Sequence, residues 1–326
     1  MKAIVITKYG SPDVLQFEEV DKPTPKDDQI LVRVQAASAN PLDWHGMRGK
    51  PFIARLMGNG LLKPKSSKVG ADVAGWVEAV GKDVTQFKPG DEVFGGCNGS
   101  FAEYACARQD RVALKPANLS FEEAAAVPVA AYTALQGLRD KGKIQPGQRV
   151  LVNGASGGVG TFAVQIAKSF GAEVTGVCST RNLDMLRKIG ADHVIDYTQE
   201  DFTRNGQRYD LILDAVGNHS VSDYKRALNP EGVCVVVGFS GMSYMIQHMI
   251  VGSFASKTGS KKISMMLTKP NKEDLIFMKQ LLEDGKVVPV IDRRYPLSEV
   301  PEAIRYLEAG HAQGKVIITV EHNDKT

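Results

Sequence analysis

A glycine-rich turn between a buried strand and a helix is the part of this sequence best suited to chemistry. An apolar run at 150–153 is typical of a buried strand, and a helical pattern follows the turn. Ala155, Gly157 and Gly160 match the dinucleotide fingerprint, with alanine in place of its first glycine. This spacing lets the backbone approach a pyrophosphate at the helix N-terminus. A second strand at 173–178 favours dinucleotide binding over a plain glycine-rich turn.

The end of that second strand indicates which dinucleotide binds. NAD enzymes usually place a carboxylate there to hold the adenosine ribose. This chain has Ser179, Thr180 and Arg181 instead. Since arginine holds phosphate through a planar fork of charged hydrogen bonds, the sequence predicts NADPH rather than NADH. The alternative is that Arg181 is only a solvated residue at the start of a helix.

Composition excludes several other classes of protein. The 326 residues are 43% hydrophobic, enough for two domains with substantial cores. With 40 Lys+Arg against 37 Asp+Glu, the charge is nearly balanced, so we expect no nucleic-acid partner. Four scattered cysteines without a CxxC pair predict reduced thiols rather than a disulfide framework. We find no stretch long enough for a membrane span and no targeting segment, and we therefore expect a cytoplasmic protein without an integral membrane segment.

The pattern along the chain predicts an α/β protein with two domains. Residues 1–125 and 286–326 contain short alternating or apolar runs that favour a mostly β domain. Residues 126–285 alternate strands with helices, as in a doubly wound parallel sheet of the Rossmann type. The expected strands of this second domain lie within Arg149–Asn153, Glu173–Cys178, His193–Asp196, Asp210–Gly217 and Gly232–Phe239, and the expected helices within Thr161–Phe170, Asn182–Ile189 and Ser220–Leu228.

Seven motifs in a fixed order cover nearly the whole chain. They are found at Ala39–Trp44, Gly70–Gly81, Phe87–Gly95, Ala124–Leu135, Asn153–Gly160, Ile189–Tyr197 and Ala309–Ile318. With them the chain resembles a zinc-independent, quinone oxidoreductase-like member of the medium-chain dehydrogenase/reductase superfamily. Within that superfamily the chain resembles plastid envelope quinone oxidoreductase homologues and alkenal or enone reductases. The resemblance implies a GroES-like β domain built from both chain ends and a Rossmann domain between them.

The resemblance also implies which residues bind the cofactor. The pyrophosphate would lie against residues 156–159, and the adenosine with its 2′-phosphate against residues following the second and third strands of the Rossmann domain. The remaining positions would border the nicotinamide or, in the case of Lys315, hold a phosphate. The implied set is Ser156, Gly157, Gly158, Val159, Ser179, Arg181, Tyr197, Thr133, Gly238, Phe239, Ser240 and Lys315. Duller alternatives are that Tyr197 only caps a strand and that Lys315 is solvated.

Departures from the zinc-dependent branch of the superfamily decide the expected chemistry. Where that branch has a cysteine and a His-Glu pair for a catalytic zinc, this chain has Asn40 and Ala71-Asp72. The lobe that would hold a second zinc retains Cys97 alone. Zinc needs three protein ligands in a catalytic site and four in a structural one, so we expect no metal. Without a Lewis acid, alcohol oxidation loses its main electrostatic help.

We therefore expect hydride transfer from NADPH to the C=C bond of an α,β-unsaturated carbonyl or to a quinone, in an apolar cleft between the domains. Asn40 could donate a hydrogen bond to the developing oxyanion, and Asp43 and Trp44 follow on what we expect to be the same loop. His45 is a weak candidate for the proton donor. Solvent or the cofactor ribose offers another proton route.

The segment Lys261–Leu267 predicts how two copies would associate. It resembles the edge strand of the Rossmann sheet, through which two subunits would pair into a homodimer. The alternative is a strand protected by its own lysines. Three other functions stay open: an NADPH-binding sensor or structural protein with little turnover, an NAD(P)-dependent alcohol dehydrogenase, and a peripheral membrane protein.

Overall fold

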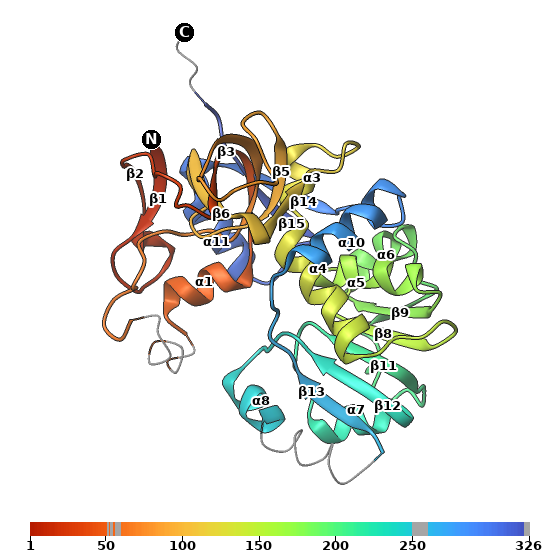
Figure 1. The fold of residues 1–326 in the computed structure, drawn as a ribbon. Helices are drawn as coiled ribbons and strands as arrows, with labels where there is room; N and C mark the ends of the chain where they lie inside the picture. Colours follow the sequence, from red (N-terminus) through yellow and green to blue (C-terminus); the bar gives the residue numbers. More distant parts are fainter. Residues whose placement is uncertain (51, 53–54, 56–59, 250–259, 323–326) are drawn as a thin grey trace. The chain divides into compact units, whose positions relative to one another are not determined.

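The computed structural model describes residues 1–50, 52, 55, 60–249 and 260–322 (Figure 1). Contacts group the chain into two compact units. Unit 1 comprises residues 1–129, 270–283 and 289–326, and unit 2 comprises residues 130–269 and 284–288. The expected class, an α/β protein with a mostly β domain and a doubly wound parallel-sheet domain, is confirmed.

Unit 2 is built on a six-stranded, fully parallel sheet. Its strand order is β10-β9-β8-β11-β12-β13, so the chain starts in the middle and winds outward in both directions, as in dinucleotide-binding folds. The strands are β8 (Arg149–Asn153), β9 (Glu173–Cys178), β10 (His193–Asp196), β11 (Tyr209–Asp214), β12 (Leu228–Val236) and β13 (Lys262–Met265).

The central strands are apolar because both faces of this sheet are covered. Val150, Leu151 and Val152 are all fully buried, although successive side chains point to opposite faces. In the part of unit 2 that the structure describes, the helices are α5 (Gly158–Ser169), α6 (Leu183–Lys188), α7 (Val221–Ala227) and α8 (Met242–Gln247). Helix α4 (Pro128–Leu135) begins in unit 1 and continues in unit 2 as a π-helical turn at Gln136–Lys141. The strands and helices expected here are therefore present, with small shifts at their ends.

A seven-stranded sheet forms most of unit 1. Its order is β14-β15-β3-β4-β5-β7, with β6 paired to the first half of the long strand β3, and β1 and β2 form a separate hairpin. The strands are β1 (Lys2–Ile6), β2 (Leu15–Glu19), β3 (Gln29–Ala39), β4 (Asp72–Val80), β5 (Glu92–Gly96), β6 (Tyr104–Arg108), β7 (Val112–Leu114), β14 (Ile291–Pro296) and β15 (Lys315–Thr319).

Among the described residues of unit 1, the α-helices are α1 (Pro41–Arg48), α3 (Phe121–Ala125), α10 (Lys272–Glu283) and α11 (Val300–Glu308). Helix α10 lies within the range 126–285 that the sequence pattern places in the nucleotide-binding part. It groups with unit 1 because it packs beside β7 and the turn after it: Asn118 donates to the carbonyl of Leu282 over 3.0 Å, and Lys279 to that of Lys115 over 3.4 Å.

A buried carboxylate organises the loop after β11. Asp214 is fully buried and accepts hydrogen bonds from the backbone N–H groups of Val216 and Gly217, each over 2.7 Å. It also accepts from Asn153 at the end of β8, over 3.0 Å, and from the hydroxyl of Tyr224 on α7. The carboxylate thus joins two neighbouring strand ends and a helix.

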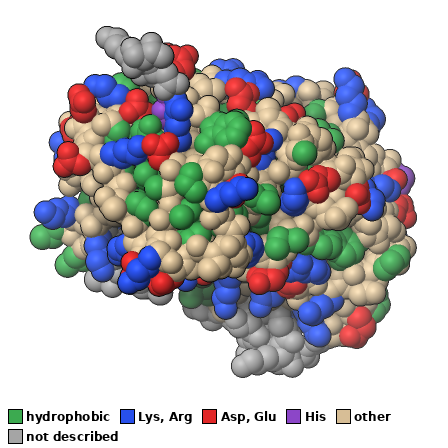
Figure 2. Space-filling model, turned by 45° about the horizontal axis from the view of Figure 1, so that its top comes forward, with side chains coloured by type: hydrophobic (Ala, Val, Ile, Leu, Met, Phe, Trp, Pro, Cys, Tyr) green, Lys and Arg blue, Asp and Glu red, His purple; other side chains and the backbone are tan. Residues whose placement is uncertain are grey.

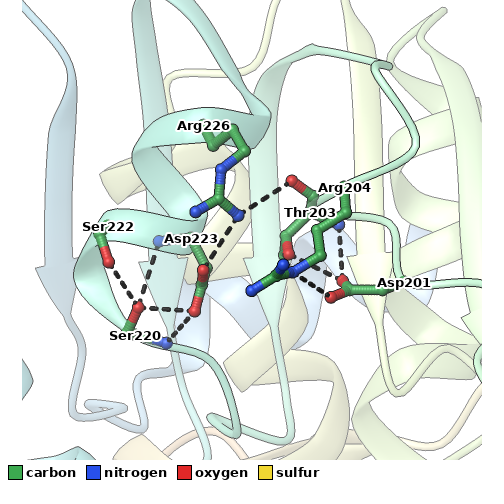
Figure 3. A network of polar contacts seen from close by, with 7 residues as sticks. All are labelled: Asp201, Thr203, Arg204, Ser220, Ser222, Asp223 and Arg226. Carbon is green, nitrogen blue, oxygen red and sulfur yellow. Dashed lines mark hydrogen bonds and ion pairs between the residues drawn. The ribbon is translucent and has the colours of Figure 1, made fainter.

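The start of helix α7 is fixed by a second polar network (Figure 3). Ser220 and Asp223 form a capping box, in which the carboxylate of Asp223 accepts from the backbone N–H and the hydroxyl of Ser220. Arg226 donates to Asp223 over 3.0 Å and to the carbonyl of Thr203 over 3.3 Å. Asp201 in turn accepts from the N–H and hydroxyl of Thr203. This network ties α7 to the loop that leads into β11.

Acidic and basic side chains are interspersed over the face drawn in Figure 2, in keeping with the near balance of charges in the sequence. Of the helices in the described part of the chain, none combines the length and the apolar character needed to cross a bilayer.

The contact between the loops after β11 and β12 should be sensitive to a single methyl group. A Cβ atom at Gly238 would overlap the carbonyl oxygen of Ala215. We expect Gly238→Ala to lower the free energy of unfolding by about 1–3 kcal/mol, measured by urea denaturation, because the backbone must shift to make room. Gly241→Ala is the control, since the nearest atom to its Cβ would be 3.9 Å away. Equal stability of the two variants would contradict the tight contact.

Candidate functional site

The turn after β8 has the geometry of a phosphate-binding loop. Gly157 is the N-cap of α5, and the first intrahelical bond runs from the N–H of Thr161 to the carbonyl of Gly157. The N–H groups of Gly158 and Val159 therefore lie in the first turn, where no intrahelical acceptor exists. A Cβ at Gly160 would overlap the backbone of Gly154 and Ala155, so only glycine allows the helix to pack this closely. These features fit the pyrophosphate of a dinucleotide.

Asn182 links this turn to the loop after β9. Its side-chain amide donates to the hydroxyl of Ser156 over 3.1 Å and to that of Ser179 over 3.3 Å, and Asn182 is only 3% exposed. Two residues that the resemblance assigns to different parts of the cofactor are thus brought together. Sequence reasoning overlooked Asn182, although its place next to Arg181 was a usable signal.

The adenosine end of the predicted site is formed where β9 and β10 end side by side. Arg181 is exposed in the turn directly after β9, and Tyr197, 63% exposed, directly follows β10. The backbone N–H of Tyr197 donates to the carbonyl of Cys178 over 3.0 Å. Asp196 of β10 is paired with Cys178 of β9 in the sheet register. Its carboxylate therefore lies where these two strands end, which was not expected from the sequence. The pKa of Asp196 is lowered, above all by the hydrogen bond that the hydroxyl of Thr180 donates to its carboxylate.

The residues expected near the nicotinamide come from two parts of unit 2. Thr133 on α4 is 8% exposed, and its hydroxyl lies 2.8 Å from that of Thr268, which follows β13 and was not predicted. Gly238, Phe239 and Ser240 form the loop after β12, and the Ser240 hydroxyl donates to the carbonyl of Gly217 over 3.2 Å. Thr133 is thus held by α4, and residues 238–240 are held by the loop that Asp214 organises.

In unit 1, three side chains from separate strand ends form a buried polar cluster. Asn40 directly follows β3, Asp72 begins β4 and Lys315 begins β15. The Lys315 ammonium donates to the amide oxygen of Asn40 over 2.7 Å and lies 3.4 Å from the Asp72 carboxylate. The amide nitrogen of Asn40 donates to Asp72 over 2.8 Å and to the carbonyl of Ser38 over 3.2 Å. We call these three residues the Asn40–Asp72–Lys315 cluster.

Burial of the cluster changes how its members can act. Asn40 is 2% exposed, Asp72 is fully buried and Lys315 is 3% exposed, so the alternative of a solvated Lys315 is wrong. Both N–H groups of the Asn40 amide are already engaged, and direct donation to a substrate would require one of these bonds to break. That Lys315 binds a cofactor phosphate stays a prediction.

Asp43 and Trp44 lie on helix α1 and not on a loop, which corrects the expectation from the sequence. The helix begins here because Asn40 is its N-cap, Pro41 its first residue and Asp43 its third, whose carboxylate accepts from the N–H of Asn40 over 2.8 Å. Burial raises the pKa of Asp43 to about 7. The ring of Trp44 stacks on that of His45, with centroids 3.7 Å apart. The catalytic roles of Asp43 and Trp44 remain predictions.

In the described ranges, no group of three or more His, Cys, Asp or Glu side chains is arranged to hold a metal ion. Burial raises the pKa of Cys97, whose thiol therefore has no tendency to ionise at neutral pH.

Comparison with known proteins places these features in a family. Residues 26–117 match the alcohol dehydrogenase GroES-like domain, and residues 189–318 match the family described as zinc-binding dehydrogenase. The chain is 39% identical over 333 residues to 2-methylene-furan-3-one reductase of Solanum lycopersicum, which covers 98% of this chain and 79% of that protein. It is 34% identical over 337 residues to the chloroplast envelope quinone oxidoreductase homolog of Arabidopsis thaliana, with 98% of each chain covered.

Solved structures of quinone oxidoreductases are similar to this chain over nearly its whole length. The quinone oxidoreductase of Coxiella burnetii has a TM-score of 0.86 at 33% identity, covering 98% of this chain and 99% of that one. The Escherichia coli quinone oxidoreductase, solved in complex with NADPH, has a TM-score of 0.83 at 26% identity, covering 98% and 100%. The chain belongs to the quinone oxidoreductase-like group of the medium-chain dehydrogenase/reductase superfamily.

Proposed function

We propose that this protein is an NADPH-dependent reductase that transfers hydride to the C=C bond of α,β-unsaturated carbonyl compounds or to quinones, without zinc. The observation that carries the proposal is the Asn40–Asp72–Lys315 cluster. Asn40 and Asp72 stand where the zinc-dependent branch has metal ligands, and here their side chains are bonded to an ammonium group. Relatives named for enone and quinone reduction support the same reaction.

The residues of unit 2 have the task of holding and orienting the cofactor. When bound, NADPH would supply the hydride from C4 of its nicotinamide. The N-terminus of α5, with Ser156, Gly157, Gly158 and Val159, would hold the pyrophosphate. Ser179, Arg181 and Tyr197 would face the adenosine and its 2′-phosphate. The nicotinamide would lie against the other predicted positions, namely Thr133, Gly238, Phe239 and Ser240.

A conjugated substrate suits a site without a metal. Its β-carbon is already electrophilic, so the protein needs only to stabilise charge on an oxygen atom. An isolated alcohol would have to lose a proton and a hydride without a Lewis acid. We assign the final proton to solvent or to the cofactor ribose, and Asp43 and Trp44 of α1 are the further side chains to test.

One prediction concerns the reaction that the protein catalyses. With NADPH the protein should reduce short enals, enones or quinones and oxidise simple alcohols poorly. Deuteride from C4-labelled NADPH should appear on the β-carbon of the saturated carbonyl product, measured by mass spectrometry and NMR.

Deuterium on the carbonyl carbon, giving an allylic alcohol, would instead indicate alcohol dehydrogenase chemistry. No consumption of NADPH with any acceptor would favour a sensor or structural role. Elemental analysis of the active protein should find no stoichiometric zinc, and a zinc ion required for turnover would overturn the metal-free part of the proposal.

Selectivity for NADPH rests on Arg181 in the turn after β9. A hydrogen bond to a charged group contributes about 1.5–3 kcal/mol, so Arg181→Ala should weaken NADPH binding by roughly ten- to a hundredfold. Binding of NADH should hardly change, because NADH lacks the 2′-phosphate. Fluorescence titration with both cofactors measures the two affinities.

Arg187→Ala is the matched control, since this arginine lies on α6 and pairs with Asp184 over 2.8 Å. Equal losses for NADPH and NADH in Arg181→Ala would show that the residue does not recognise the phosphate. The carboxylate of Asp196 at the same edge would then be the better candidate for contact with the ribose.

We also propose a homodimer through Lys261–Leu267, paired edge to edge. The support is that β13 is the last strand of the sheet, and that β13 pairs only with β12 in the described residues. The N–H of Met266 donates to the carbonyl of Val236 on β12. Because successive N–H groups of a strand point in opposite directions, that of Met265 points away from β12, toward the open edge.

Proline at position 265 should therefore separate the subunits without breaking the ladder to β12. We expect Met265→Pro to sediment as a monomer and the control Met265→Ala as a dimer, because only proline removes the outward N–H. A proline variant that stays dimeric would place the interface elsewhere.

A cytoplasmic location remains a prediction, and several relatives are named for mitochondria or chloroplasts.

A further inference from the structure

Asp72 does not need the buried ammonium of Lys315 to complete its hydrogen bonds. Asp72 already accepts three hydrogen bonds from neutral donors: the hydroxyl of Ser38 over 2.7 Å, the amide of Asn40 over 2.8 Å and the backbone N–H of Val129 over 3.0 Å. Lys315 lies farther from the Asp72 carboxylate than these three donors do, at 3.4 Å. Burying two opposite charges carries a desolvation penalty, and replacing a whole buried ion pair by apolar residues of similar volume often leaves stability unchanged.

The contacts of Asn40 and Asp72 instead hold the ammonium group of Lys315 in a fixed position. The shortest bond of Lys315 goes to the Asn40 oxygen, 275 positions away in the sequence, and Asn40 is oriented for it because its nitrogen is bound to Asp72 and Ser38. An ammonium has three N–H groups. Asn40 and Asp72 take two of them in the contacts that the structure describes, which leaves one for a further acceptor.

From this arrangement we infer that Lys315 is a catalytic residue, whose ammonium stabilises the oxyanion formed during reduction, with Asn40 and Asp72 as its positioning residues. The inference rests on the proposed function. Hydride released from the C4–H bond of NADPH, which would become NADP⁺, would form a new C–H bond at the β-carbon, and the C=C electron pair would move to give an enolate with negative charge on oxygen. Lys315 would donate a hydrogen bond to that oxygen. A proton from solvent then adds to the α-carbon and the carbonyl re-forms.

This assignment gives the chain's own cation the charge-stabilising role that a metal has in the zinc-dependent branch. It also moves the oxyanion donor from Asn40 to Lys315, because the Asn40 amide has no N–H left over in the cluster. A fixed positive charge in a buried site stabilises a developing anion far better than the same charge in water.

The test compares turnover with cofactor affinity in variants of Lys315. Lys315→Met should lower kcat for an enone such as methyl vinyl ketone by about a hundred- to a thousandfold, as loss of a main oxyanion donor does. Its Kd for NADPH, measured by fluorescence titration, should stay within about threefold of the wild-type value. Lys315→Arg keeps the charge and should recover at least about tenfold of the lost turnover.

Lys115→Met is the matched control, because Lys115 is also buried in unit 1 but binds the carbonyls of Pro116 and Leu119 and the carboxylate of Glu92. It should change the melting temperature without a comparable loss of kcat. If Lys315→Met does not fold, the neutral variant Lys315→Gln serves with the same two measurements.

Three results would overturn the inference. Unchanged kcat in a folded neutral variant of Lys315 would show a purely structural lysine. Loss of NADPH affinity as large as the loss of kcat would place Lys315 on a cofactor phosphate. Equal loss of turnover in Lys115→Met and Lys315→Met would point to general destabilisation. If the wild-type protein reduces no enone or quinone, the proposed function itself fails, and the two failures are thereby distinguished.

Discussion

Two buried carboxylates each hold together several strand ends and loops of the proposed site, because a charge removed from water must be fully hydrogen-bonded. Asp214 in unit 2 is surrounded by backbone N–H groups, an amide and a phenol. Asp72 in unit 1 is surrounded by a hydroxyl, an amide, a backbone N–H and an ammonium. Each carboxylate fixes chain segments that are distant in sequence, and each does so beside residues of the proposed site.

The parts of the fold that follow from local pattern could be predicted from the sequence. The phosphate-binding turn lies within 12 consecutive positions, 149–160, and its glycines have meaning only in one strand-turn-helix context. The strands of unit 2 are continuous apolar runs because both faces of a parallel sheet are covered. Helix α1 was missed although its signals were present: Asn40 as cap, Pro41 at the first position and Asp43 at the third.

Contacts between distant strands could not be predicted in this way. Nothing near Lys315 in the sequence indicates that its partner is Asn40, because that contact depends on the antiparallel register of β15 with β3. Asp196 was overlooked for a related reason: the expected acid was sought at the end of β9, whereas the sheet brings one from the neighbouring strand β10. Pattern thus gave the elements, and register determined which side chains meet.

The bridge made by Asn182 has a consequence for how a dinucleotide would be held. Since one buried amide binds Ser156 in the phosphate turn and Ser179 in the loop after β9, neither loop can change position without disturbing the other. A ligand that orders one loop thereby removes part of the conformational entropy that ordering the second would cost. The two halves of the proposed nucleotide site would in that sense be coupled. A fragment carrying only the adenosine end would prepare the pyrophosphate turn for the rest of the molecule.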